Sequence, residues 1–283
     1  MRPPARHRTL YLSLMIFLAA AVATAAAATT AKTITAASGG VSATLSFRHD
    51  GAPSAVIPYR DLRLVISGGG RARYERPVSA ILCATECWPA SAEAGAPVLR
   101  VVTLERGRGA DVVLNLYSGG AHCCSITQVF TYSRGSYSLD QHDFGDPGAA
   151  LERLAGGWAF VSADDRFAYE FTSFASSGLP LQIWRFRGDR FVDVTHAFPA
   201  RVEADATRQY RAYLANRQQG LGLGFLAAWA ADEDLLGKRT HAARTLGALA
   251  AAGELRSGDG FSGGGRAFIA ALERFLAKTG YPH

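Results

Sequence analysis

The chain has 283 residues, of which 19% are charged, and its formal net charge is +6. Three of the 30 basic residues lie in an acid-free stretch at the N-terminus, so the remainder carries 27 basic and 24 acidic residues, an ordinary solvated surface. The arginines are scattered among acidic residues without a basic stripe or a nucleic-acid-reading motif, so we expect no nucleic-acid partner.

The N-terminus has the layout of a secretory signal peptide over residues 1–28. Met1–Arg8 is basic, Leu10–Ala28 is an uninterrupted run of apolar and small residues, and Ala26–Ala28 offers a cleavage site. An uncleaved membrane anchor is the alternative, because about 20 apolar residues span a bilayer. No cysteine ends the run, so no lipid anchor is expected. We expect a secreted or periplasmic, cell-envelope protein that contacts the membrane only if the leader is uncleaved.

Residues 29–200 are predicted to form a β-repeat domain. Val, Ile, Phe, Tyr and Thr are abundant from Val41 to Phe198, and Gly, Pro, Ser or Asp interrupt them every eight to twelve residues. This pattern is typical of short strands joined by turns. The predicted strands are Val41–Phe47, Leu62–Ser67, Val98–Leu104, Asp111–Tyr117, Ser125–Tyr132, Tyr137–His142, Trp158–Ala163, Phe167–Thr172, Leu181–Phe186 and Phe191–Thr195.

One strand, turn, strand pattern occurs twice at a constant offset of 54 residues, in Gln128–Phe144 and Gln182–Phe198. Because side chains alternate along a strand, the aromatic residues of each first strand share one face, which we expect to point inward. Each intervening turn contains a glycine, as tight hairpin turns prefer. The matched pairs are Gln128/Gln182, Phe130/Trp184, Tyr132/Phe186, Tyr137/Phe191, His142/His196 and Phe144/Phe198.

Residues 201–283 change to a helical period and are predicted to form a helical C-terminal region. Leu246–Leu255 is a further, Ala-rich helix candidate, and we interpret Gly220, Gly222 and Gly224 as a helix breaker. The fold class is therefore mainly β, with antiparallel propeller-like or stacked-sheet repeats and a C-terminal α-helical region. The apolar helix faces are Val202, Ala206, Tyr210 and Tyr213; Phe225, Leu226, Trp229 and Leu236; and Phe268, Leu272, Phe275 and Leu276.

The four cysteines, Cys83, Cys87, Cys123 and Cys124, are expected to form disulfides, because an exported chain meets an oxidising environment. Three pairings are open. A local Cys83–Cys87 loop is geometrically easy, whereas a bridge between adjacent cysteines is strained. The alternatives are a zinc ion held by these thiols with His122, and a Cys124 nucleophile activated by His122. We expect neither, and predict no metal site and no cofactor.

One segment resembles the repeats of secreted bacterial β-propeller proteins of the FG-GAP or VCBS type. The segment is Leu116–Cys124, of sequence LYSGGAHCC, preceded by Gly109–Leu114. A second copy, Gly156–Asp165, is similar in placement, and the resemblance covers roughly Val98–Phe198. It implies propeller-like blades and, in the family, Asp- and Gly-rich loops that bind calcium before each strand.

The sequence departs from this family in its loops and in its repeat count. Glu105–Gly109 and Glu152–Gly156 each offer one carboxylate beside arginine, whereas calcium needs several oxygen ligands, so the calcium loops are not retained. Residues 29–200 hold only about three units of this length, and a closed propeller needs about four to eight blades. We expect a partial, propeller-like array or an open sheet stack capped by the helices.

Polar loop residues supply the candidate binding site. The loops Ser118–His122 and Ser173–Gly178 are expected to display side chains, while Asp140, Asp143 and Asp146 surround His142 in the sequence. Turn formation is the alternative role for such aspartates next to Gly and Pro. The candidate binding residues are Ser118, Gly119, Gly120, His122, His142, Asp164 and Asp165, and no catalytic residue is assigned.

Two functions are compatible with these residues. The first is a secreted, non-enzymatic protein that binds an unidentified extracellular protein or a carbohydrate, because repeat scaffolds commonly serve as binding surfaces and no nucleophile elbow or zincin helix is present. The second is an extracellular hydrolase acting on carbohydrate or envelope substrates with an acidic pair or with His122 and a neighbouring residue. Convergence of loops on one cleft lined by His142, Asp164 and Asp165 favours the hydrolase, and loops dispersed on an open face favour binding.

Overall fold

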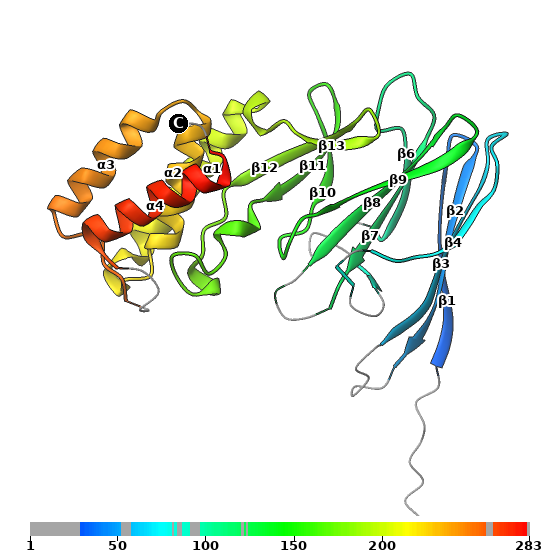
Figure 1. The fold of residues 1–283 in the computed structure, drawn as a ribbon, viewed down its shortest axis with the longest axis horizontal. Coiled ribbons are helices and arrows are strands. Elements are labelled where there is room, and N and C mark those ends of the chain that lie inside the picture. Colours follow the sequence, from blue (N-terminus) through cyan, green and yellow to red (C-terminus); the bar gives the residue numbers. More distant parts are fainter. Residues whose placement is uncertain are drawn as a thin grey trace, which may run out of the picture.

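A computed structural model describes residues 29–51, 58–80, 82–83, 87–90, 97–119, 122, 124–258 and 263–281. The predicted signal peptide, residues 1–28, lies outside the described residues, as do Gly120 and Cys123. The described part forms three antiparallel sheets followed by four α-helices, which confirms the predicted fold class. The sheets and the helical region follow one another along the long axis of the molecule (Figure 1).

The first sheet is an antiparallel meander of β1 (Thr29–Ser38), β2 (Val41–Asp50), β3 (Tyr59–Gly68) and β4 (Tyr74–Pro77). Every second residue of β2 is buried, from Val41 to Phe47, so one face of the sheet forms core and the other meets solvent. Gly39 and Gly40 both have positive φ angles, of 57° and 74°, in the tight turn that joins β1 to β2.

The second sheet comprises β5 (Trp88–Pro89), β6 (Leu99–Val102), β7 (Asp111–Tyr117), β8 (Ser125–Ser133) and β9 (Ser136–Asp143). Its central strand β7 is apolar on both faces. Val112 and Leu114 pack in the core shared with the first sheet, whereas Val113 packs in the core shared with the third sheet. A strand covered on both faces reads as a continuous apolar run, which explains the sequence of β7.

The third sheet comprises β10 (Ala150–Leu154), β11 (Gly157–Ala163), β12 (Leu181–Arg187) and β13 (Arg190–Asp193). The two look-alike segments are hairpins, β8–β9 and β12–β13, and each turns through two residues with positive φ angles. Their matched rings enter different cores. Phe130 contacts Tyr74 of the first sheet, whereas Trp184 packs between the second and third sheets.

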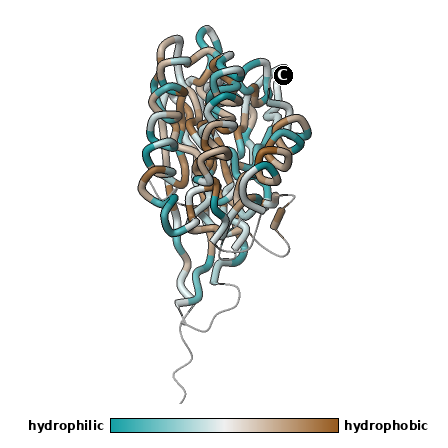
Figure 2. Tube along the Cα trace, turned by 90° about the vertical axis from the view of Figure 1, so that its left-hand side faces the viewer, coloured by the Kyte–Doolittle hydropathy of each residue, from teal (hydrophilic) through white to brown (hydrophobic). Residues whose placement is uncertain are grey.

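The helical region begins with α1 (Pro199–Asn216) and continues through α2 (Leu223–Leu235), α3 (Arg239–Ala251) and α4 (Gly265–Thr279). The predicted apolar face of α4 is buried, and Gly220 ends the short helix that follows α1 with a φ of 74°. Figure 2 looks onto this end of the molecule, where polar and apolar residues alternate along the helices. No described helix is long and apolar enough to cross a membrane.

Four short 3₁₀ helices occupy the connections, and one of them overturns a prediction. The segment Phe167–Thr172 is not a strand. Phe167 is the last residue of η1 (Asp165–Phe167), and the residues that follow it in this segment form no strand. The rings of Phe167 and Phe171 are buried in the helical core against Phe275. Tertiary packing on α4 therefore decides the conformation of a segment whose aromatic composition favours β structure. The other 3₁₀ helices are η2 (Phe174–Ser176), η3 (Thr195–Ala197) and η4 (Arg217–Gln219).

Candidate binding cavity

Three of the candidate binding residues, His142, Asp164 and Asp165, line one cavity of about 410 Å³. The cavity lies where the end of β9 and the loop after it meet the loop after β11 and the strands β12 and β13. Segments from both repeated hairpins thus contribute to it. The other lining residues are Asp143, Phe144, Gly145, Ala163, Arg166, Gln182, Trp184 and Asp193.

Aromatic rings form one wall of the cavity. The centroid of the His142 ring lies 4.1 Å from that of Trp184 and 4.5 Å from that of Phe144. Burial lowers the pKa of the His142 imidazole below its ordinary value, although the carboxylates of Asp143, Asp140 and Asp193 act in the opposite direction. The ring is therefore neutral at pH 7 and offers both a donor and an acceptor nitrogen.

Asp164 is a structural residue. Its side chain is 2% exposed and accepts hydrogen bonds from the Arg166 guanidinium, from the Arg166 backbone N–H and from the hydroxyl of Tyr281 at 2.9 Å. The Arg166 guanidinium also donates to the carbonyl of Thr279, at the end of α4. Both oxygens of Asp164 are thus engaged, and the residue joins the cavity wall to the C-terminal helix.

Asp165 differs from its neighbour because no basic side chain pairs with it in the described part of the chain. Burial raises the pKa of Asp165, and the negative charges of Asp146 and Asp143 raise it further. Its Oδ1 is buried without a hydrogen-bond partner among the described residues. Gly145 permits this placement, since a Cβ there would lie 2.4 Å from the Asp165 side chain.

Two further aspartates in the cavity use one oxygen each for local structure. Asp143 Oδ1 accepts from the Gly145 N–H at 2.9 Å, and Asp193 Oδ1 accepts from the N–H and hydroxyl of Thr195 at 2.8 and 2.6 Å. Neither is paired with a basic side chain within the described ranges. The polar wall therefore presents hydrogen-bond acceptors, and its charge is negative.

The two predicted display loops meet beside this cavity. The ring of His122 stacks on that of Phe174 at 3.8 Å, and its Nδ1 lies 3.9 Å from Asp146 Oδ1. Ser118 has a structural role, because its hydroxyl accepts from the Cys124 N–H at 2.8 Å. Gly119 packs against the indole of Trp88. Of the described candidate residues in this loop, only His122 therefore presents its side chain to the partner loop.

Tyr169 completes an exposed aromatic group with His122 and Phe174, and no sequence pattern singled it out. Its side chain is 46% exposed, and its ring lies 5.3 Å from Phe174. Its φ angle is +62°, which is rare for a bulky residue and is held by a hydrogen bond from its N–H to the Ser177 hydroxyl. A backbone conformation of this kind persists only where the surrounding contacts hold it in place.

The remaining sequence candidates bear on metals and disulfides. Cys83 and Cys87 form a disulfide with a Cα separation of 5.2 Å, and Cys124 is also disulfide-bonded. Among the described residues, no group of three or more His, Cys, Asp or Glu side chains is arranged to hold a metal ion. Glu105, in the connection before β7, pairs with Arg108 at 3.2 Å, and Glu152, which lies in strand β10 and not in a loop, pairs with Arg201 at 2.8 Å.

Comparison with known proteins adds two relatives. No family model matches the chain, and no solved structure matches it significantly. The chain is 31% identical to the "probable thylakoid lumen protein sll0997" of Synechocystis sp. over 159 residues, which cover 53% of this chain and 47% of that protein. It is 28% identical to the "uncharacterized protein y4bJ" of Sinorhizobium fredii over 156 residues, covering 51% and 24%. The chain thus spans less than half the length of these relatives.

Proposed function

We propose that this is a non-enzymatic binding protein of the secreted or periplasmic compartment, and that the cavity beside His142 holds a carbohydrate. The observation that carries the proposal is the pairing of an aromatic wall, Trp184 with Phe144, and three carboxylates, Asp143, Asp165 and Asp193, that form no ion pair with a basic side chain among the described residues. Sugars present apolar C–H faces to rings and O–H or N–H donors to carboxylates, so both walls fit this class of ligand.

The partly exposed rings beside the cavity extend this surface. His122 contacts Phe174 and Tyr169 and lies 3.9 Å from Asp146, whose negative charge acts on Asp165. A saccharide chain longer than the cavity would continue onto these rings. The volume of about 410 Å³ lies in the range of ordinary ligand pockets, about 300–1,000 Å³, and accommodates one or two sugar units.

The proposal also includes export of the protein from the cytoplasm and a scaffold of FG-GAP-like repeats. The signal-peptide pattern of residues 1–28, the Cys83–Cys87 disulfide and the name of the Synechocystis relative, a probable lumen protein, all support export from the cytoplasm. Three consecutive antiparallel sheets support a scaffold of degenerate FG-GAP-like units, stacked without calcium loops.

Hydrolysis of a carbohydrate is the second candidate, and the convergence of His142, Asp164 and Asp165 on one cavity is the outcome that favours it. Asp165 keeps its proton to higher pH than an ordinary aspartate, as a general acid requires, and Asp143 lies close enough to contribute to that pKa. Binding ranks first because Asp164 is fully engaged by Arg166 and Tyr281, which leaves only one carboxyl of the adjacent pair available.

A glycan array followed by calorimetry with the strongest hit tests both candidates. Asp165→Asn and Asp143→Asn keep the shape of each side chain and, for Asp143, the oxygen that accepts from Gly145. Each substitution is expected to weaken binding about tenfold, the value of one hydrogen bond to a charged group. Glu273→Gln, on the exposed face of α4, is the matched control and should bind as the wild type does.

Turnover of the bound glycan distinguishes a binding protein from a hydrolase. Binding without release of new reducing ends from the bound glycan supports the binding protein. Reducing ends that appear with the wild type and disappear with Asp165→Asn support the hydrolase. If no glycan binds, or if both cavity variants bind as well as Glu273→Gln does, the cavity is not the carbohydrate site.

A further inference from the structure

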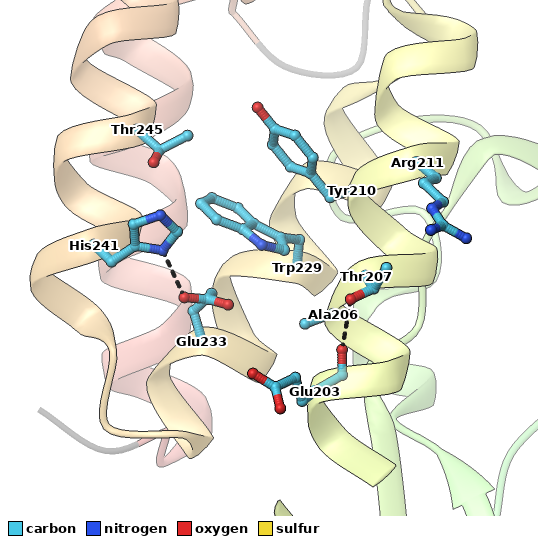
Figure 3. A pocket seen from close by; sticks show the side chains of 9 residues that line it. All are labelled: Glu203, Ala206, Thr207, Tyr210, Arg211, Trp229, Glu233, His241 and Thr245. Atoms are coloured by element: carbon cyan, nitrogen blue, oxygen red, sulfur yellow. Dashed lines mark hydrogen bonds and ion pairs between the residues drawn. The ribbon is translucent and has the colours of Figure 1, made fainter. Parts of the chain in front are cut away.

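A second cavity, of about 360 Å³, lies in the helical region and shares no residue with the first. Helices α1 and α3 flank it and α2 forms its floor (Figure 3). Its interior combines two aromatic rings, two carboxylates and one imidazole. The lining residues are Glu203, Ala206, Thr207, Tyr210, Arg211, Trp229, Glu233, His241 and Thr245.

The aromatic part of this cavity is preorganised. The rings of Tyr210 and Trp229 lie 5.2 Å apart, and the His241 ring stands edge-on to Trp229 at 5.9 Å. Trp229 is 4% exposed and therefore fixed by the helical core, while Tyr210 is only partly buried. Such rings attract a cation at their faces and cover the apolar stem that carries it.

The acidic part is centred on Glu233, which is 6% exposed. Its Oε2 lies 2.8 Å from His241 Nδ1, and its other oxygen points into the cavity (Figure 3). The His241 imidazole therefore engages one oxygen of Glu233, and the second oxygen of this desolvated carboxylate is the acceptor that faces the cavity.

Two basic residues lie near this carboxylate. Lys238 pairs with Glu203, across the cavity on α1, at 2.8 Å and also attracts Glu233, but it is not among the lining residues. Arg211 lines the cavity, but its side chain points away from the interior (Figure 3). The interior thus carries negative charge beside aromatic faces, which is the environment of an ammonium site.

We infer that this cavity binds a small primary amine, with the ammonium group at Glu233 and the stem against Tyr210 and Trp229. The cavity-facing oxygen of Glu233 accepts a hydrogen bond, which favours a primary ammonium over a quaternary one, because a quaternary ammonium has no N–H to donate. The cavity volume suits a single small organic molecule rather than a peptide segment. The inference is independent of the carbohydrate proposal.

Calorimetry of the full chain with 2-phenylethylamine tests the site, with 2-phenylethanol as the neutral probe of the same shape. The amine should bind saturably and the alcohol at least about tenfold more weakly, because only the amine gains the charge-assisted hydrogen bond. Glu233→Gln should weaken the amine about tenfold and leave the alcohol unchanged. The glycan titration of the first cavity should not change in this variant.

Two further variants keep the test decisive if Glu233→Gln proves unstable. Glu203→Gln alters an exposed carboxylate and should also weaken the amine, whereas Glu273→Gln on α4 should not. The inference is overturned if the amine does not bind saturably, if amine and alcohol bind equally, or if neither cavity carboxylate changes amine binding relative to Glu273→Gln.

Discussion

At the scale of single residues, burial and partners decide what each aspartate can do. Asp164 and Asp165 are adjacent, yet the first is fixed by Arg166 and Tyr281 while the second keeps a buried oxygen without a described partner. Asp232 is an extreme case. It is fully buried beside Asp205, and burial followed by that neighbouring carboxylate raises the pKa of Asp232 to about 10.

Protonation of Asp232 makes stability depend on pH. The unfolded chain releases this proton near the ordinary aspartate value, but the folded protein keeps it up to a pKa of about 10. Between these values the folded state binds one more proton, so the free energy of unfolding falls as pH rises. One group contributes at most about 1.4 kcal/mol per pH unit.

Asp232→Asn should remove this contribution, because an amide has no proton to lose. Urea unfolding between about pH 5 and pH 9 should show wild-type stability falling with pH more steeply than that of the variant, and the variant more stable at the alkaline end. Glu273→Gln controls for the loss of a carboxylate at an exposed position. Equal slopes for Asp232→Asn and the wild type would contradict the assignment of a buried, protonated Asp232.

Part of the cavity lining could be predicted from the sequence. The aspartates clustered around His142 and after β11 indicated a polar site, because short polar side chains near turns can be recognised in a sequence without knowledge of the fold. The sequence predicts a core position for Trp184 and singles out no role for Tyr169. The positions of both beside the cavity depend on which strands and loops are neighbours in space, and residue spacing along one strand does not contain this information.

At the scale of elements, the contact between α2 and the loop that carries η2 explains an unusual glycine. Gly224 lies within α2, where alanine is normally better by about 1 kcal/mol. A Cβ at Gly224 would lie 2.6 Å from the carbonyl oxygen of Ser176 and 2.8 Å from the Thr172 hydroxyl. The glycine therefore permits a close approach of helix and loop, which places Phe171 and Phe167 in the helical core.

Alanine should act in opposite directions at two helical glycines. Gly224→Ala should lower the free energy of unfolding by about 1–3 kcal/mol, because backbone must move to make room. Gly247 lies in α3 with nothing within 4 Å of an added Cβ, so Gly247→Ala should raise stability by about 0.5–1 kcal/mol. Thermal or urea unfolding compares the two, and stabilisation by Gly224→Ala would contradict the packing described for α2.

The bounds of a predicted element were most accurate where the segment is a compact apolar run. The prediction Asp111–Tyr117 coincides with β7, whereas the helix predicted at Leu246–Leu255 is α3, Arg239–Ala251. The strand β1 was not predicted, because its side chains are mostly exposed and carry little apolar alternation. An exposed, polar strand forms because it pairs with a neighbouring strand, and the sequence of the segment alone does not identify that neighbour.

In the whole molecule, four apolar clusters of described residues hold the layers together. They fill the space between the first and second sheets, the space between the second and third sheets, the other face of the third sheet, and the interior of the helical region. The sheets stand in a row rather than a ring in the part of the chain that the structure describes (Figure 1). The sequence predicted the layers from composition, but the order of packing follows from long-range contacts that composition does not encode.

Tyr281, which follows α4, links the helical region to the end of strand β11 in the third sheet. Tyr281 is 6% exposed, and its hydroxyl donates to Asp164 beside the first cavity. Tyr281→Phe should lower the free energy of unfolding by about 1–3 kcal/mol, since a buried carboxylate loses a donor. Tyr59→Phe, in the first sheet, should change it little. If Tyr281→Phe and Tyr59→Phe changed the free energy of unfolding equally in chemical denaturation, a stabilising contact between Tyr281 and Asp164 would be contradicted.

We propose that carbohydrate binds in the cavity between the second and third sheets. Backbone amide chemical shifts, recorded while the strongest glycan from the array is titrated into the folded protein, report which residues the glycan contacts. We expect the largest shift changes at His142, Gly145, Asp165 and Trp184, with smaller changes at His122 and Tyr169. Changes confined to the outer face of the first sheet or to the helices, with these residues unaffected, would contradict it.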